Sequence, residues 1–272
     1  MSVQAEGLRP FASAHLTGSA VFEPVPFKVY THRDLDRIAA LDGLSAEQRF
    51  EMKVVASVLP FRVNQYVIDE LIDWTRVPDD PIFQLTFPQR GMLAPAHYER
   101  IAELMRRGAS REELDAAIAE VRQELNPHPA DQMEMNMPLD DEGNRLDGMQ
   151  HKYRETVLFF PSQGQTCHSY CTFCFRWAQF VGDKDLRISS SEAQTLHDYL
   201  RRHREVTDVL FTGGDPMVMK TRMLRDYLEP LLHADFDHVQ TVRIGAKALT
   251  FWPHRFLGAE DADELIELLA RL

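Results

Sequence analysis

The chain has 272 residues, of which 44% are hydrophobic and 26% are charged, enough to bury one substantial core. Its formal net charge is −12 and its 30 basic residues are scattered. This argues against a nucleic-acid partner, because a phosphate backbone needs a concentrated basic face. Apolar runs fall far short of the roughly 20 residues that cross a bilayer, and the N-terminus shows no secretory signal. We therefore expect a cytoplasmic protein that acts on small molecules, without a membrane or nucleic-acid partner.

The N-terminal half is expected to be helical. The first 30 residues show weak periodicity and are predicted to form an irregular arm. Apolar residues at helical spacing predict a helix that opens at Leu44 to Glu47 and is ended by Pro60. A second helix is predicted over Val63 to Trp74, and the proline-rich segment from Val77 to Gln89 is predicted to be an extended connector.

Two further helices are predicted over Pro95 to Arg107 and Ser110 to Leu125. The second opens with Ser110 and Glu113 in the spacing of a capping box. The polar stretch from Asn126 to Gly148 contains three prolines and is predicted to be a linker. Residues 1–148 are thus interpreted as an N-terminal helical region with an extended connector and a linker.

After Gly148 the pattern becomes strand, loop and helix, repeated three times. The strands are predicted at Thr156 to Phe160, Thr207 to Thr212 and His238 to Ile244. Short apolar strands that alternate with helices imply an α/β fold with a parallel sheet covered by helices. The helices are predicted from Ser191 to His203, around the inward residues Met223, Leu224, Tyr227, Leu228 and Leu231, and from Glu260 with an apolar stripe of Leu265, Ile266, Leu268, Leu269 and Leu272.

The end of this pattern looks incomplete. A parallel sheet of three strands leaves two bare edges. The last helix stops on the apolar Leu272 without a C-cap. We therefore expect either a C-terminally truncated chain or a partner that supplies the missing strands.

All three cysteines of the chain lie within eight residues, in the loop after the first predicted strand. Cys167, Cys171 and Cys174 have the spacing Cys-x3-Cys-x2-Cys, and their small odd number suits a reducing compartment. Three thiolates from one loop can each bind one iron of a cubane cluster and leave the fourth iron open. The alternatives are a zinc site completed by His168 or another histidine, and three unligated thiols. Only half of the usual paired zinc-knuckle pattern is present.

This spacing, with the aromatic Phe173 before the last cysteine, resembles the radical S-adenosylmethionine (SAM) superfamily. Gly213-Gly214-Asp215, at the end of the second predicted strand, is similar to the family motif that receives the amino group of SAM. Glycines allow close backbone approach, and a carboxylate can accept hydrogen bonds from an ammonium group. The resemblance implies a [4Fe-4S] cluster that binds SAM and cleaves it reductively to a 5′-deoxyadenosyl radical. It also implies that residues 149–272 form the first half of a radical SAM (β/α)6 core, a partial barrel.

Within the superfamily, the chain resembles the lysine 2,3-aminomutase group. The similar segments, in the same order, are Asp80–Gln89, His151–Tyr153, Cys171–Arg176, Asp208–Asp215 and Val242–Ala246. The resemblance implies an isomerase that moves an amino group on a small-molecule amino acid, with an electron donor of the flavodoxin or ferredoxin type. It assigns Arg176 to the substrate carboxylate, a role that suits a guanidinium fork. The alternative is a surface arginine.

Aminomutases of this group also use pyridoxal phosphate (PLP), bound to a lysine late in the barrel. That position would lie beyond Leu272, so PLP is a possible cofactor whose lysine this chain does not contain. Lys247 matches a position that is commonly arginine and is not assigned to PLP, and the arginine that binds the PLP phosphate corresponds to Thr156. Two alternatives stay open: a PLP-independent radical SAM reaction on another substrate, and an inactive or partner-dependent iron–sulfur subunit. The sequence identifies neither the substrate nor a catalytic residue, and it leaves the oligomeric state open, a homo-oligomer included.

Overall fold

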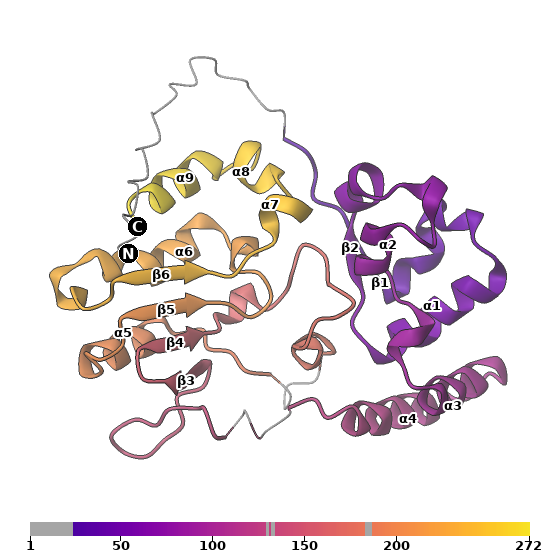
Figure 1. Cartoon of the computed structure of the whole chain (residues 1–272), viewed down its shortest axis with the longest axis horizontal. Helices are drawn as coiled ribbons and strands as arrows, with labels where there is room; N and C mark the ends of the chain where they lie inside the picture. The colour runs from indigo at the N-terminus through magenta and orange to yellow at the C-terminus, as the bar shows by residue number, and fades with distance from the viewer. Residues whose placement is uncertain (1–23, 129–130, 132–133, 183–186) are drawn as a thin grey trace, which may run out of the picture.

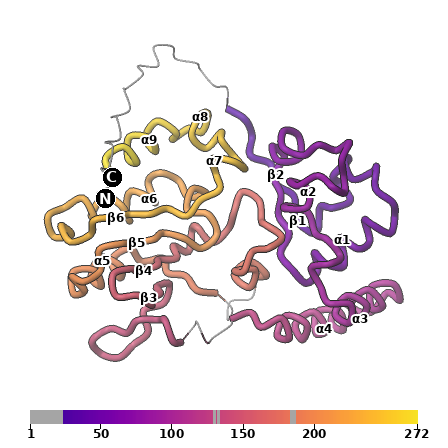
Figure 2. The backbone as a smooth tube through the Cα atoms, viewed as in Figure 1, coloured from indigo at the N-terminus to yellow at the C-terminus, as the bar shows by residue number. Residues whose placement is uncertain are grey.

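A computed structural model describes residues 24–128, 131, 134–182 and 187–272. The part of the predicted N-terminal arm before residue 24 lies outside the described residues. Figures 1 and 2 show two groups of elements side by side. We call them the helical group (residues 24–128, with β1, β2 and α1 to α4) and the sheet region (the described residues from 134 onward, with β3 to β6 and α5 to α9). No helix in the described segments combines the length and the apolar character of a membrane span.

The helical group is built on four helices and a two-stranded antiparallel pair. Three of the predicted helices are present as α1, α3 and α4. Ser45 and Ser110 cap α1 and α4 through their hydroxyls, and a proline opens α3. The Ser110 hydroxyl accepts from the backbone N–H of Glu113 at 3.2 Å. The elements are β1 (Val29–Thr31), α1 (Ala46–Val58), β2 (Arg62–Asn64), α2 (Pro81–Thr86), α3 (Pro95–Arg106) and α4 (Arg111–Glu124).

Two predictions in this group need correction. The helix predicted over Val63 to Trp74 is shorter than expected, because Val63 and Asn64 belong to β2, which pairs with β1, and the helical turns cover only residues 65–71, with a π-helix at Val67–Leu71. The segment from Val77 to Gln89 is not fully extended, because it contains α2. Asp80 caps this helix by accepting from the backbone N–H of Phe83 at 2.8 Å, and proline fits the first helical turn, where no N–H donor is needed.

The sheet region contains a four-stranded sheet in the order β3-β4-β5-β6, which confirms the α/β class. The three predicted strands are present and run parallel in register as β4 (Thr156–Phe159), β5 (Asp208–Phe211) and β6 (Thr241–Ile244). The additional strand β3 (Met149–Tyr153) pairs antiparallel with β4 and covers one of the two edges expected to be bare. It escaped prediction because the polar run Gln150-His151-Lys152 breaks the apolar pattern.

Helices cover one face of this sheet. Side chains that alternate along β4 and β5, including Phe159 and Phe211, are buried against α5, α6 and α9. Burying each of these side chains contributes roughly 2 to 3 kcal/mol. The helices are α5 (Ala193–Arg202), α6 (Thr221–Leu228), α7 (Ala248–Phe251), α8 (His254–Leu257) and α9 (Ala262–Ala270).

Three apolar residues predicted to point inward are exposed instead. Met223 on α6 is 38% exposed, Ile266 on α9 is 49% exposed, and Leu272 is 44% exposed. Each buried stripe is narrower than predicted, since Leu224, with 1% of its surface exposed, and Leu265, with 0%, already fill the contact with the sheet.

Candidate functional site

The cysteine loop, residues 165–176, leaves the carboxyl end of β4 and runs between the sheet region and the helical group (Figure 1). Its three cysteines are partly buried and form no disulfide. Burial raises the pKa of the Cys167 thiol, and the negative charges of Asp215, Cys174 and Cys171 raise it further. Burial also raises the pKa of Cys174, with a contribution from Cys171. A thiolate at Cys171 therefore disfavours ionisation of the other two cysteines.

The donor set of the cysteine loop is of the kind that holds an iron–sulfur cluster. Within the described residues, no group of three or more His, Cys, Asp or Glu side chains is placed to hold one ion. His168, the candidate fourth zinc ligand, is buried, and its ring lies edge-on to Phe27 at 5.5 Å between centroids. A cubane cluster has a different requirement, because each thiolate binds a different iron and the sulfurs surround the cluster instead of converging on one point. The three free, partly buried thiols supply the ligand type that such a cluster needs.

Main-chain hydrogen bonds attach the cysteine loop to the helical group. The backbone N–H of Tyr170 donates to the carbonyl of Arg62 on β2 at 2.8 Å. The backbone N–H of Thr172 donates to the carbonyl of Leu85 on α2, also at 2.8 Å. The two contacts lie on either side of Cys171, so β2 and α2 determine the position of that cysteine.

Asn64 joins the helical group to both sides of the site and was not identified from the sequence. Its side-chain Nδ2 donates to the carbonyls of His168, at 3.3 Å, and Phe251, at 2.8 Å. Its Oδ1 accepts from the backbone N–H of Val67 at 3.0 Å, and the whole residue is buried. The strand β2 reads Arg-Val-Asn, so no local pattern singles out Asn64, and its partners lie about a hundred or more positions away in sequence.

The Gly213-Gly214-Asp215 turn follows β5 and contacts the cysteine loop directly. Gly213 has φ of +132°, a conformation that only glycine adopts easily. A Cβ atom on Gly214 would lie 2.2 Å from the backbone oxygen of Thr166. The backbone N–H of Asp215 donates to the same oxygen at 2.7 Å. The glycines therefore let this turn approach the residue that precedes Cys167.

Asp215 is only 2% exposed, and both carboxylate oxygens bind backbone groups. Oδ1 accepts from the N–H of Met217 and Oδ2 from the N–H of Lys247, each at 2.9 Å. The ring Nδ1 of His168 lies 3.6 Å from Oδ2. Asp215 thus connects the end of β5, the segment after β6 and the cysteine loop.

Lys247 reaches back from the end of β6 to the cysteines. Its Nζ donates to Sγ of Cys171 at 3.3 Å. The same ammonium lies 5.4 Å from the ring centre of Phe173 and 5.5 Å from that of Phe251, within cation–π range of both. Phe173 itself is 73% exposed, so its ring is accessible to a ligand.

Arg176 lies just after the last cysteine, with its guanidinium 4.0 Å from the ring centre of Phe160. Burial lowers its pKa to about 10, although the nearby Cys174 opposes this shift. Even so, the side chain remains a cation at neutral pH. No carboxylate of the described residues pairs with it, so the guanidinium is available to an anionic ligand.

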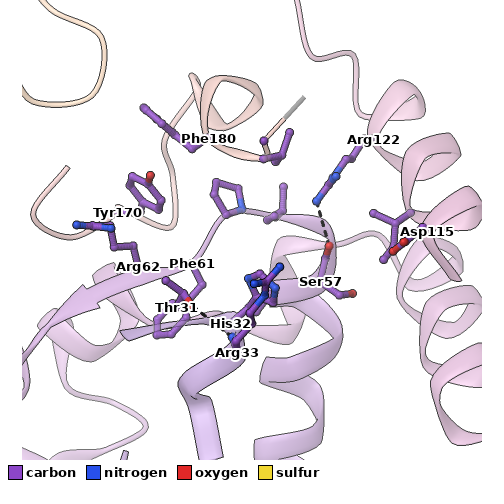
Figure 3. A pocket seen from close by; sticks show the side chains of 16 residues that line it. Thr31, His32, Arg33, Ser57, Phe61, Arg62, Asp115, Arg122, Tyr170 and Phe180 are labelled. Carbon is purple, nitrogen blue, oxygen red and sulfur yellow. Dashed lines mark hydrogen bonds between the residues drawn. The ribbon is translucent and has the colours of Figure 1, made fainter. Parts of the chain in front are cut away.

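A cavity of about 520 Å³ lies behind the cysteine loop, between it and the helical group (Figure 3). In Figure 3 the Arg62 side chain lies beside Tyr170, turned away from His32 and Arg33. At the other end, Arg122 donates to the carbonyl of Ser57 at 3.1 Å. The described residues that line this cavity include none of the predicted site residues.

A smaller cavity of about 210 Å³ reaches the predicted site itself. Cys171 and Cys174 form part of its wall, together with Trp177 and residues of the helical group. Two of the three cysteines are therefore accessible from this side of the loop.

Comparison with known proteins identifies amino-acid 2,3-aminomutases among the relatives of this chain. A putative L-lysine 2,3-aminomutase of Aquifex aeolicus is 29% identical over 228 residues, which are 84% of this chain and 48% of that protein. The L-lysine 2,3-aminomutase of Methanococcus maripaludis is 31% identical over 51% of this chain and 30% of its own length. The glutamate 2,3-aminomutase of Clostridioides difficile is 31% identical over 50% of this chain and 32% of its own length. No protein-family profile matches the chain.

These relatives are amino-acid 2,3-aminomutases. The similarity is modest, but it agrees with the resemblance drawn from the cysteine and glycine motifs. The chain spans about half the length of the Aquifex relative and about a third of the other two.

Proposed function

We propose that this chain carries a radical SAM site of the 2,3-aminomutase kind. In this proposal Cys167, Cys171 and Cys174 hold a [4Fe-4S] cluster whose fourth iron binds SAM. One observation carries the proposal: three free thiols lie within eight residues of a single loop, and a Gly-Gly-Asp turn contacts that loop directly before Cys167.

The residues around the cysteines suit the two ends of SAM. Each oxygen of Asp215 accepts one backbone hydrogen bond, which leaves further acceptor capacity for the ammonium group of SAM. Gly214 lets the turn lie against the backbone of Thr166, and Gly213 lies against the side chain of Gln165. The exposed ring of Phe173 offers an apolar face next to the last cysteine.

When bound, the cluster and SAM supply one-electron cleavage of SAM to methionine and a 5′-deoxyadenosyl radical that abstracts a hydrogen atom from the substrate. The protein contributes binding and orientation. Arg176, supported by the ring of Phe160 and unpaired within the described residues, is proposed to hold the carboxylate of an amino-acid substrate. The electron is proposed to come from a donor of the flavodoxin or ferredoxin type.

The same proposal covers the architecture. The parallel strands β4, β5 and β6 with their helices would form the first part of a (β/α) barrel, preceded by a helical region that ends near residue 148. The sheet face opposite α5, α6 and α9 would then point toward the barrel interior.

A PLP-independent reaction is a second candidate, and contacts on that inner face favour it. Thr156, which occupies the position of the PLP-phosphate arginine, donates from its hydroxyl to Asp208 at 3.1 Å. Arg243, the cation on the same face of β6, is ion-paired with the same carboxylate, Nε to Oδ1 at 2.9 Å. Among Thr156, Asp208 and Arg243, the only cation is therefore already paired and is not available to a phosphate group.

Assays of SAM cleavage and of β-amino acid formation distinguish aminomutation from a PLP-independent reaction. Anaerobically reconstituted protein with dithionite should form 5′-deoxyadenosine, and Cys171→Ala should abolish this activity because it removes one iron ligand. Formation of a β-amino acid from L-lysine or L-glutamate only when PLP is added would support aminomutation. SAM cleavage without a β-amino acid would support the second candidate. Equal 5′-deoxyadenosine formation by the wild type and Cys171→Ala would refute both.

A further inference from the structure

A single lysine from outside the cysteine loop contacts one of the proposed cluster ligands. Lys247 donates from Nζ to Sγ of Cys171 at 3.3 Å. Asp215 fixes the other end of the residue by accepting from its backbone N–H at 2.9 Å. Between these ends, the rings of Phe173 and Phe251 lie on the ammonium group. Three side-chain contacts and one backbone hydrogen bond place the ammonium group beside the sulfur.

The charge around the cysteine loop differs from that of the chain as a whole. The chain carries a net charge of −12, yet three cations, Arg62, Arg176 and Lys247, lie in or beside this loop.

Only one of these cations hydrogen-bonds to a cysteine sulfur within the described chain. Arg176 lies over the ring of Phe160, and Arg62 lies beside Tyr170 and faces the ring of Phe27 at 6.0 Å (Figure 3). Lys247 instead directs its charge at the sulfur, and none of the described carboxylates forms a salt bridge with it.

We propose that Lys247 is a positioning residue that raises the reduction potential of the cluster by donating a charged hydrogen bond to the sulfur of Cys171. This inference rests on the proposed function, because it requires the cluster. Hydrogen bonds to ligand sulfurs and net charge both set the potential of iron–sulfur centres. Three thiolates make the loaded site negative, and reduction adds one more negative charge. A fixed ammonium group therefore stabilises the reduced form more than the oxidised form.

The test is a redox titration of the anaerobically reconstituted full chain, with the reduced fraction measured by EPR. Lys247→Met removes the charge and the donor while keeping an unbranched side chain. At a fixed applied potential we expect the ratio of reduced to oxidised cluster to fall about tenfold, equivalent to about 59 mV for one electron. Lys247→Arg, which keeps the charge and the donor, should stay within about twofold of the wild type.

The matched control is Lys152→Met, which removes an exposed lysine on β3 and should leave the titration unchanged. If Lys247→Met loses its iron, Lys247→Gln takes its place as a neutral donor and should still lower the ratio. An unchanged potential in the neutral variants, or an equal shift in Lys247→Arg, would overturn the inference. Failure of the proposed function is a separate result, because the wild type would then contain no cluster to titrate.

Discussion

Both sides of the cysteine loop are held by neutral hydrogen bonds to the main chain, but among the described residues only the sheet side adds a charged hydrogen bond to a cysteine sulfur. On the side of the helical group, the contacts are neutral hydrogen bonds to the main chain, from Asn64 and from the carbonyls of Arg62 and Leu85. On the side of the sheet region, a glycine turn touches the loop backbone and Lys247 touches a sulfur. We infer a division of roles. The helical group sets the shape of the cysteine loop, and the sheet region sets both how closely the loop approaches the end of β5 and the charge next to its sulfurs.

The largest effect is expected at the closest contact on the sheet side. Gly214→Ala places a Cβ atom 2.2 Å from the Thr166 oxygen and 2.5 Å from two other backbone atoms of that residue. Because main chain cannot move aside as a side chain can, we expect a loss of roughly 3 kcal/mol in the free energy of unfolding and of most bound iron. Urea denaturation and iron analysis measure the two quantities.

The control for this variant is Gly43→Ala. Nothing lies within 4 Å of the Cβ position at Gly43, so we expect a change within about 0.5 kcal/mol. Equal stability of the two alanine variants would show that the glycine turn does not limit the approach to the cysteine loop.

Asn64→Ala tests the opposite side. It removes two donors to the carbonyls of His168 and Phe251 and the acceptor for the N–H of Val67, all in a buried position. We expect a loss of about 2 kcal/mol in the free energy of unfolding and weaker iron loading. The fraction that does load should keep the wild-type reduction potential, in contrast to Lys247→Met.

The exposed Asn144→Ala is the matched control and should cost less than about 1 kcal/mol, since its amide bonds only to Asp140 at the surface. A shifted reduction potential in the iron-loaded fraction of Asn64→Ala would contradict the proposed division of roles.

A third test addresses the support behind the Gly-Gly-Asp turn. Arg255 donates to the carbonyls of Met217 and Met219 and is ion-paired with Asp261, Nη1 to Oδ1 at 2.8 Å. Burial opposes ionisation of Asp261, but hydrogen bonds from Thr221 and the charge of Arg255 outweigh it and lower its pKa. A lowered folded-state pKa stabilises the protein above the unfolded value of about 3.9, and this stability is lost as pH falls through the folded value.

We therefore expect Asp261→Asn to cost about 1 kcal/mol at pH 7, a figure discounted for the partial exposure of the carboxylate. The difference from the wild type should shrink below pH 4, in thermal unfolding followed across pH. Asp198→Asn, which alters an exposed pair with Arg201, is the control and should cost about 0.5 kcal/mol or less. A constant difference between pH 7 and pH 3 would contradict the assigned ionisation.

The smallest effect is expected from the two exposed aromatic residues next to the last cysteine. Phe173 is 73% and Phe175 is 76% exposed, so neither contributes much to stability. Phe173→Ala should weaken SAM binding about fivefold, because one aromatic contact contributes roughly 1 kcal/mol. Phe175→Ala should leave SAM binding unchanged, and equilibrium dialysis with labelled SAM compares the two. Equal effects would mean that Phe173 has no particular role in SAM binding.

Elements that depend on local sequence patterns could be predicted, and elements that depend on distant partners or on single caps could not. The strands β4 to β6 and the helices α1, α3 and α4 follow from apolar periodicity, a local property. The strand β3 and the helix α2 do not, because β3 is polar and depends on pairing with β4, whereas α2 depends on the cap provided by Asp80.

In the candidate site, the cysteines and the glycine turn could be predicted because their spacing along the chain carries the chemistry. Asn64 and Lys247 could not, because each acts on residues that are far away in sequence and that only folding brings near. The exposed positions of Met223, Ile266 and Leu272 have a related cause, since the width of a buried helix face depends on the surface it covers.

The central claim is that Cys167, Cys171 and Cys174 hold an iron–sulfur cluster with one open iron. Its most direct test is metal and sulfide analysis of the anaerobically reconstituted protein, combined with EPR of the reduced form before and after SAM is added. The proposal predicts about four irons and four sulfides per chain, a signal that changes on SAM addition, and loss of iron in each single Cys→Ala variant. One zinc per chain, or iron that all three variants retain, would contradict it.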